Sequence, residues 1–417
     1  MDPNVSTPAA TSSNSQTSAA AKTERLMSLD VFRGATIASM MLVNNPGSWD
    51  HVYPPLEHAP WHGWTFTDTV FPFFLWIVGV AVPFSIGRRV EAGERRDELV
   101  FKIFKRAIVL FAVGLFLNAF SYFWKGAFSL EGHGFGYWMS EMAKHVRYPG
   151  VLQRIGICYL FAGLIFLNTK IRGQMIWTAA LLAIYTVLMR FGPAIFGFNS
   201  PDLYAVHGNF SEWIDTMVFN GHVFRDSTTY DPEGIISTIP AIATTLFGIL
   251  TGHLLRCQKF SATEKTVWLF VGGTLLMFAG NLFALWQPIN KRLWTASYSI
   301  FMAGLAMNVF AVYYWLVDIK GWRAWAKPLA IYGMNAITVF VLAGLIGRLT
   351  IEIKVAGGKM VLKTWLYNHT FGALADPKGI NLLSADVASM LWGLIVYCFG
   401  LYLVAYVMYR RKWFVKF

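Results

Sequence analysis

The sequence predicts an all-α, polytopic membrane protein with about ten transmembrane helices, and three observations lead to this fold class. Of the 417 residues, 55% are hydrophobic and only 14% are charged, whereas about 25% is usual in a soluble domain. The apolar residues fall into runs close to the ~20 residues that cross a bilayer. Lys and Arg are divided unequally between alternate connections of those runs. This composition excludes a soluble enzyme, a disordered protein and a nucleic-acid-binding protein.

The N-terminal segment has a composition of its own. Residues 1–24 are rich in Ser, Thr, Ala and Asn, and they contain too few large apolar side chains to offset the entropy cost of ordering. We therefore predict a disordered tail over 1–24 and one transmembrane domain over 25–417. The predicted spans lie near 28–46, 68–87, 103–122, 149–168, 174–191, 235–254, 265–286, 297–317, 328–350 and 386–409.

The first span is the least apolar of the ten, because Asp30 and Arg33 lie at its start. Three residues apart on a helix, these side chains share one face and can pair, which lowers the cost of placing both near the bilayer. Gly and Pro occur within several other spans, where neighbouring helices can satisfy the backbone groups that they leave free.

The basic residues predict the topology. With span ends assigned to the nearer side, 22 of the 35 Lys and Arg residues lie on the side that carries both termini. The positive-inside rule then places both termini in the cytoplasm. The long loops face the outside or the periplasm under this assignment, and eight of the nine histidines lie in them. These loops are 47–67, 123–148, 192–234 and 351–385.

The loop between the first two spans contains the most informative residues. His58 is a candidate general base or nucleophile, and Asp68, ten residues later, is a candidate partner that would fix its tautomer. Asn44 supplies an amide that could donate to an oxyanion. In the alternative interpretation the loop histidines are solvated and Asp68 is only a helix cap.

Two further clusters lie in the predicted outer loops. Asp231 and Glu233 flank a proline before the sixth span, where they could bind hydroxyls or an amine, or could only cap the helix. Asn290 and Lys291 precede the eighth span, and the cation there runs against the topological trend. It is therefore a candidate to meet a ligand or the carboxylates.

Charged residues near the spans have structural as well as functional interpretations. Arg154 lies one turn into a span, where it is costly unless it faces protein or water, and a structural acid partner would explain it equally well. The stretch from Arg88 to Arg106 sets topology and faces lipid headgroups, or binds a polyanion from the cytoplasm. Three cysteines give neither a disulfide framework nor a metal spacing, and we expect no metal site.

Several motifs occur in one order along the chain, and together they carry a family resemblance. The sequence resembles the heparan-alpha-glucosaminide N-acetyltransferase family in its bacterial form. The matching segments are Leu29–Asp30 with Arg33–Gly34, Val43–Asn44, His58–Ala59–Pro60–Trp61–His62–Gly63, Thr67–Asp68, Tyr148–Pro149–Gly150 through Gly156, Tyr230–Asp231–Pro232–Glu233–Gly234, Pro288–Ile289–Asn290–Lys291, and Gly333–Met334–Asn335–Ala336.

The resemblance implies transfer of an acetyl group across the membrane, from cytosolic acetyl-CoA to an amino sugar or glycan on the other side. It implies His58 as the catalytic residue, with Asp68 and Asn44 beside it, and it implies location in a bacterial inner membrane. A homodimer is a possible assembly. We predict that the donor is held by Arg33, Arg88, Arg89, Lys105, Arg106, Arg154 and Asn335. We predict that the acceptor is held by Trp61, Asp231, Glu233, Asn290 and Lys291.

The mechanism requires that the acetyl thioester reach His58, so we expect a passage through the membrane to this ring. The residues leave open whether His58 acts as a base or accepts the acetyl group itself. They also leave open two other functions: an O-acetyltransferase of envelope glycan hydroxyls, and a transporter of a sugar or lipid-linked intermediate that uses histidines as a proton relay.

Overall fold

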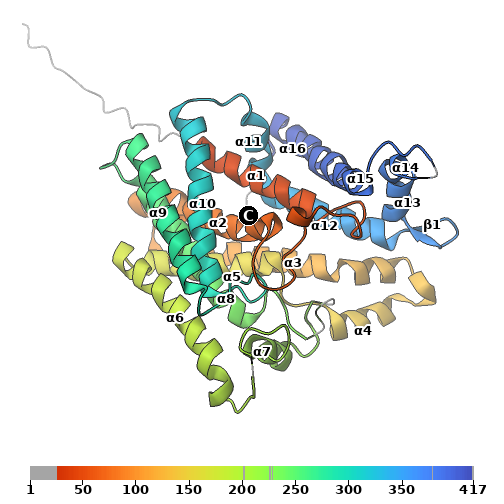
Figure 1. Ribbon diagram of the computed structural model, residues 1–417, viewed down its shortest axis with the longest axis horizontal. Coiled ribbons are helices and arrows are strands. Elements are labelled where there is room, and N and C mark those ends of the chain that lie inside the picture. Colours follow the sequence, from red (N-terminus) through yellow and green to blue (C-terminus); the bar gives the residue numbers. More distant parts are fainter. Residues whose placement is uncertain (1–25, 201, 225–226, 228, 378, 416–417) are drawn as a thin grey trace, which may run out of the picture.

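The computed structural model describes residues 26–200, 202–224, 227, 229–377 and 379–415. The predicted tail over residues 1–24 lies outside this range. Almost all regular structure in the described residues is helical, and the long helices gather into one bundle (Figure 1).

The long helices correspond to the ten apolar runs, with ends that differ by up to seven residues. They are α1 (Met27–Val43), α2 (Phe66–Glu91), α3 (Arg96–Ala127), α5 (Val151–Asn168), α6 (Ile171–Ile195), α8 (Ile235–Arg256), α9 (Ala262–Phe283), α10 (Ala296–Tyr314) continued by the π-helix η3 (Trp315–Ile319), the pair α11 (Lys327–Met334) and α12 (Ala336–Glu352), and α15 (Ala385–Trp392) continued by the π-helix η4 (Gly393–Phe399) and α16 (Gly400–Arg410).

Short elements lie in the connections between them. These are η1 (Pro54–Leu56), η2 (Leu130–Gly132), α4 (Phe135–His145), α7 (Phe210–Phe219), the strands β1 (Lys354–Val355) and β2 (Met360–Val361), α13 (Leu362–Asn368) and α14 (Phe371–Leu374). The two strands form one antiparallel hairpin.

Seven helices of the described residues are long and apolar enough to cross a membrane, and α11 with α12, bent by 76° at their junction, is an eighth candidate. The two remaining predicted runs form α1, which has 17 residues, and α3, which begins with a strongly charged segment. The structure therefore confirms a largely helical protein of membrane-spanning type. Ten spans and the cytoplasmic placement of both termini stay predictions.

Helices α2 and α8 form the centre of the bundle, since 78% of the apolar stretch of each is buried. Helix α2 is apolar on all sides, a pattern typical of a helix surrounded by others. In contrast, only 22% of the corresponding stretches of α6 and α9 is buried, and both helices lie at the edge of the molecule (Figure 1). Their exposed apolar faces are suited to lipid.

The bundle has two distinct ends. Helices α2, α5, α8 and α10 begin at one end, where their first residues contact the same loops. We call this end the His58 end. Asn118 donates to the carbonyl groups of Arg147 and Pro149, and Gly63 donates to that of Ile289. At the opposite end Arg256 pairs with Glu91 at 2.6 Å, and Ser28 N–H donates to Asp318 at 3.2 Å.

Glycine permits the close contact of α2 and α8. A Cβ atom on Gly79 would lie 1.9 Å from the Thr245 carbonyl oxygen, and one on Gly248 would lie 2.1 Å from that of Trp76. No side chain fits there unless the helix backbones separate, because carbonyl groups within a helix cannot rotate away.

We expect Gly79→Ala to destabilise the protein by at least the ~1–3 kcal/mol that overpacking usually costs, since the clash is with backbone. Thermal unfolding of the detergent-solubilised protein measures the effect. Gly347→Ala is the matched control, because its Cβ would lie 3.8 Å from its nearest neighbour, the Asn45 Oδ1 atom. An unchanged unfolding temperature in Gly79→Ala would show that this contact is not tight.

Candidate active site

The start of α2 brings Asp68 against His58. Asp68 is the third residue of the helix, and its Oδ2 accepts the backbone N–H groups of Thr65 at 3.0 Å and Ala59 at 2.9 Å. Its Oδ1 lies 2.7 Å from Nδ1 of His58. Asp68 is therefore a helix cap and, at the same time, the hydrogen-bond partner of His58.

Lys291 joins this pair from the loop between α9 and α10. Its Nζ lies 3.3 Å from Oδ1 of Asp68 and 3.1 Å from Nδ1 of His58. Burial lowers the pKa of Lys291, while the charges of Asp68 and Glu233 act in the opposite direction. The sequence predicts Lys291 as a sugar-binding residue, but the structure places it beside His58.

We assign the tautomer of His58 from the shorter of its two Nδ1 contacts, the one with Asp68 at 2.7 Å rather than the one with Lys291 at 3.1 Å. An ionised Asp68 beside an ammonium group accepts the proton of Nδ1–H, which leaves the lone pair on Nε2. Nε2 makes no hydrogen bond within the described part of the chain. The His58 side chain is 45% exposed, whereas that of Asp68 is 2% exposed. The ring is thus held from the buried side and open on the other.

The loop that carries Lys291 is fixed by buried hydrogen bonds. Asn290 is completely buried, and its amide donates to the Trp61 carbonyl oxygen at 2.9 Å. The Trp61 indole donates to the carbonyl oxygen of Tyr204 at 2.7 Å, and the Tyr298 hydroxyl donates to that of Asp68 at 2.6 Å. Asn290 and Trp61, predicted to bind sugar, are bonded in this structure to protein partners that hold the His58 loop.

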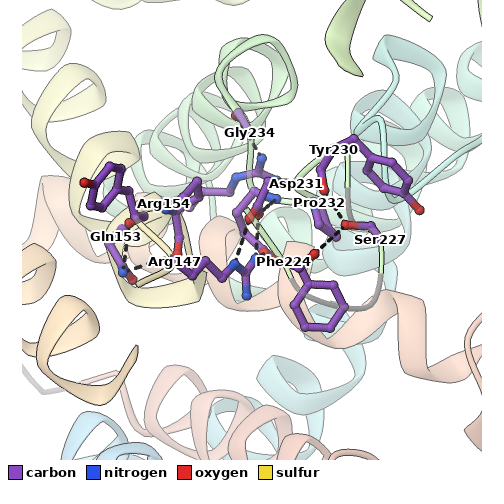
Figure 2. A network of polar contacts seen from close by, with 12 residues as sticks. Arg147, Gln153, Arg154, Phe224, Ser227, Tyr230, Asp231, Pro232 and Gly234 are labelled. Carbon is purple, nitrogen blue, oxygen red and sulfur yellow. Dashed lines mark hydrogen bonds and ion pairs between the residues drawn. The ribbon is translucent and has the colours of Figure 1, made fainter. Parts of the chain in front are cut away.

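A buried ion network lies next to this loop (Figure 2). Arg147 binds Asp231 through two bonds, of 2.7 and 2.5 Å, and also pairs with Glu233. Burial raises the pKa of Asp231 despite Arg147. Burial alone would raise that of Glu233 too, but the Arg147 and Arg154 charges hold the pKa of Glu233 below its usual value.

Arg147 was not predicted from the sequence, although a cation directly before the Tyr148–Pro149–Gly150 motif was a usable signal. Asp231 and Glu233, predicted as acceptor-binding, are brought together but are neutralised mainly by this arginine. Neither of them provides the N-cap of α8, which is Gly234.

Arg154 lies at the His58 end, in the second turn of α5. It is 1% exposed, and one terminal nitrogen donates to the Gly234 carbonyl oxygen at 3.3 Å and to the Ser237 hydroxyl (Figure 2). Its guanidinium carbon lies 5.1 Å from the ring centre of Trp294. The structure thus separates Arg154 from the other predicted donor-binding arginines.

Those other basic residues lie toward the opposite end, each with its own neighbour. Arg33 lies 3.2 Å from Asp30, Arg89 lies 3.7 Å from Glu94, and Arg88 and Arg106 lie over the rings of Phe84 and Tyr159. None of these arginines lines the cavity between α5 and α8 that is described below. The described residues contain no cluster of three or more His, Cys, Asp or Glu that could hold a metal ion.

The two predicted asparagines are not brought to His58 by any hydrogen bond within the described residues. Asn44 is the exposed C-cap of α1. Asn335 is buried at the bend between α11 and α12, where it donates to the Trp413 carbonyl oxygen and accepts from the Val415 N–H, both at 3.2 Å. Asn335 therefore binds the C-terminal segment.

Asp215 supports the ion network from α7. Its completely buried carboxyl group accepts the backbone N–H groups of Asp231 at 3.2 Å and Ile235 at 3.1 Å. Burial raises the pKa of Asp215 from 3.8 to about 7, although these two hydrogen bonds act to lower it. The segment that connects the ion network to α8 is thus fixed by a group that titrates near neutral pH.

We expect the contribution of Asp215 to stability to be complete below about pH 4 and to be lost as the pH rises to about 7. In that interval the unfolded chain releases the proton and the folded chain retains it, which costs at most about 1.4 kcal/mol per pH unit. Thermal unfolding between pH 5 and pH 8 tests this, with Asp215→Asn as the form that cannot titrate. Equal pH dependence in both proteins would contradict the prediction.

The chain is similar in sequence to known proteins over most of its length. The family model described as heparan-alpha-glucosaminide N-acetyltransferase, catalytic, matches residues 25–280. The heparan-alpha-glucosaminide N-acetyltransferases of Mus musculus and Homo sapiens are each 26% identical to the chain over 442 aligned residues. Each alignment covers 94% of this chain but 60% of the relative, so the chain spans less than two thirds of their length.

Proposed function

Because the chain belongs to the heparan-alpha-glucosaminide N-acetyltransferase family, we propose that it transfers an acetyl group from acetyl-CoA to an amino sugar across a membrane. The observation that carries this proposal is the triad of His58, Asp68 and Lys291, in which Nδ1 of the ring is bonded to Asp68, Lys291 lies beside both, and Nε2 is open. His58 and Asp68 lie within the residues that the family model matches, and Lys291 follows them in the chain.

The proposed chemistry uses Nε2 of His58. Asp68 accepts the Nδ1 proton, and Nε2 removes a proton from the acceptor amine as its nitrogen attacks the thioester carbonyl carbon. A C–N bond forms, the C–S bond breaks, and the CoA sulfur leaves with the proton from Nε2. If the acetyl group passes through His58 instead, Nε2 attacks the thioester carbonyl carbon, the C–S bond breaks and CoA leaves as the thiolate. The amine then attacks the acetyl carbon of acetyl-histidine, the bond from that carbon to Nε2 breaks, and the amine proton passes to the CoA thiolate or to solvent.

Lys291 and Asp68 act on the ring rather than on the substrate in this proposal. The ammonium group keeps Asp68 ionised, and the carboxylate keeps the proton on Nδ1. The imidazolium that forms when Nε2 takes a proton is stabilised by the same carboxylate, as in other histidine–carboxylate pairs.

The donor is proposed to approach from the opposite, basic end, which we propose faces the cytoplasm. The nucleotide part of acetyl-CoA carries several negative charges, which suit Arg33, Arg88, Arg89 and Arg106. Between Asp68 and Arg88, α2 rises about 30 Å. The pantetheine arm would therefore have to enter the bundle for the thioester to reach His58.

Transfer across sealed proteoliposomes tests the proposed function. Acetyl-CoA labelled in the acetyl group is supplied on one side and methyl glucosaminide on the other. We expect labelled N-acetyl sugar on the acceptor side, with an equal amount of free CoA on the donor side. If hydroxylamine releases the labelled acetyl group from the sugar product, the acetyl group is attached to a hydroxyl oxygen, which would indicate O-acetylation instead. Movement of methyl glucosaminide, labelled separately in its sugar ring, to the donor side without CoA release would identify a transporter.

A further inference from the structure

An apolar groove runs along the side of the bundle between α3, α5, α6 and α8. Its volume is about 600 Å³, within the range that holds a small ligand. Along α5 it is lined from Gln153 to Ile165, a rise of about 18 Å. Phe161 and Trp177, which line its sides, are 49% and 44% exposed, so the groove opens toward the lipid phase.

The groove has a polar end at Arg154 and Glu233, which both line it. Two nitrogens of the Arg154 guanidinium, Nε and Nη1, are buried and have no hydrogen-bond partner among the described residues. Unbonded donors of a buried charged group are costly, so a ligand that accepts hydrogen bonds there would be stabilised. The remaining lone pairs of the Glu233 carboxylate could accept from an amine or a hydroxyl.

This polar end lies close to the candidate active site. The Trp294 ring is in contact with the Arg154 guanidinium, and Trp294 N–H donates to the Lys291 carbonyl oxygen at 3.1 Å. Lys291 in turn lies 3.1 Å from Nδ1 of His58. Trp294 and Lys291 thus connect the polar end of the groove to the Nδ1 side of the His58 ring.

We propose that the groove binds the hydrocarbon chain of a lipid-linked acceptor, so that the natural acceptor is an amino sugar attached to a membrane lipid. This inference rests on the proposed function, whose site it supplies with a substrate from the bilayer. The hydrocarbon chain lies along α5 and the sugar oxygens accept hydrogen bonds from Arg154. For the amine to meet Nε2 of His58, the Trp294–Lys291 segment between the groove and the ring has to move aside. A water-soluble sugar would need only the polar end of the groove, and it would leave the apolar part along α5 empty.

A series of alkyl glucosaminides tests the proposal in proteoliposomes, since the head is constant and only the chain varies. Membrane partition favours long chains in any protein, so the groove is tested by narrowing it with Ile157→Trp. We expect this variant to raise the KM of hexadecyl glucosaminide about tenfold and to leave that of methyl glucosaminide unchanged. Val271→Trp, on the exposed face of α9, is the control and should change neither.

A photo-crosslinking experiment on the unaltered protein gives a second measurement that does not depend on a variant. Hexadecyl glucosaminide with a diazirine at the chain end should label groove residues of α5, α6 or α8, and excess unlabelled compound should suppress the label. Uncompeted label spread over α9, or the same hexadecyl KM in Ile157→Trp and the parent, would overturn the inference. If the protein acetylates neither hexadecyl glucosaminide nor methyl glucosaminide, the proposed function itself fails.

Discussion

His58→Ala is expected to lower acetyl transfer by about 10²–10⁴-fold, the range that a positioned acid–base group supplies. The loss should appear in kcat and kcat/KM alike, because the ring acts on the reacting groups and not on binding of the remainder of either substrate. Release of CoA in the proteoliposome assay measures the rate. The loss is expected on either route, since proton transfer and acetyl-histidine formation both use Nε2.

His51→Ala is the matched control for this prediction. His51 lies in the same connection between α1 and α2, with a side chain that is 50% exposed and 3.7 Å from Asp386, and we expect it to retain activity. Rapid quenching of the parent enzyme with labelled acetyl-CoA and no acceptor then distinguishes the routes, since only one of them leaves label on His58. Full activity in His58→Ala would remove this residue from the mechanism.

Arg147→Ala is expected to destabilise the fold by about 3–5 kcal/mol, the usual cost of removing one member of a buried ion cluster. The Asp231 and Glu233 side chains are 0% and 12% exposed, so the variant leaves two poorly hydrated carboxylates close together. Thermal unfolding in detergent measures the change. Because these residues lead into α8, the hydrogen bonds of Arg154 to Gly234 and Ser237 should loosen as well.

Two further variants separate the lost charge from the lost packing. Lys144→Ala removes an exposed lysine three residues earlier, and we expect an effect within about 0.5 kcal/mol. The triple variant Arg147→Met, Asp231→Asn, Glu233→Gln removes the charges together and should recover part of the stability lost in Arg147→Ala. If Arg147→Ala unfolds at the parent temperature, the ion network does not stabilise the fold.

The helices were largely predictable from the sequence, because each consists of a long apolar run that has one stable solution in lipid. The pairing of His58 with Asp68 was also predictable, because their separation of ten residues allows the loop to fold back against the start of α2. Lys291 was predicted to meet a ligand or the carboxylates, but its position beside both His58 and Asp68 was not predicted. Its position depends on the long-range bonds of Asn290 to Trp61 and of Gly63 to Ile289, and no local pattern encodes such contacts.

The position of Arg154 depends on packing in the same way. It was predicted to hold the donor together with the arginines of the stretch from Arg88 to Arg106, but packing places it under Trp294 and beside Glu233, at the other end of the bundle. The groove was not predicted, because it is formed by side chains from four helices that are far apart along the chain. Apolar periodicity predicts that a face is buried or faces lipid, but it does not predict a gap between such faces.

The two carboxylate oxygens of Asp68 have different partners, and this limits which residues can replace Asp68. Oδ2 is occupied by the backbone turn that starts α2, and Oδ1 is occupied by the imidazole. An asparagine has the same shape but only one oxygen, so whichever way its amide is turned, either the turn or the ring faces an NH₂ group. Architecture and reactivity at this position therefore rest on a single carboxylate and cannot be exchanged separately.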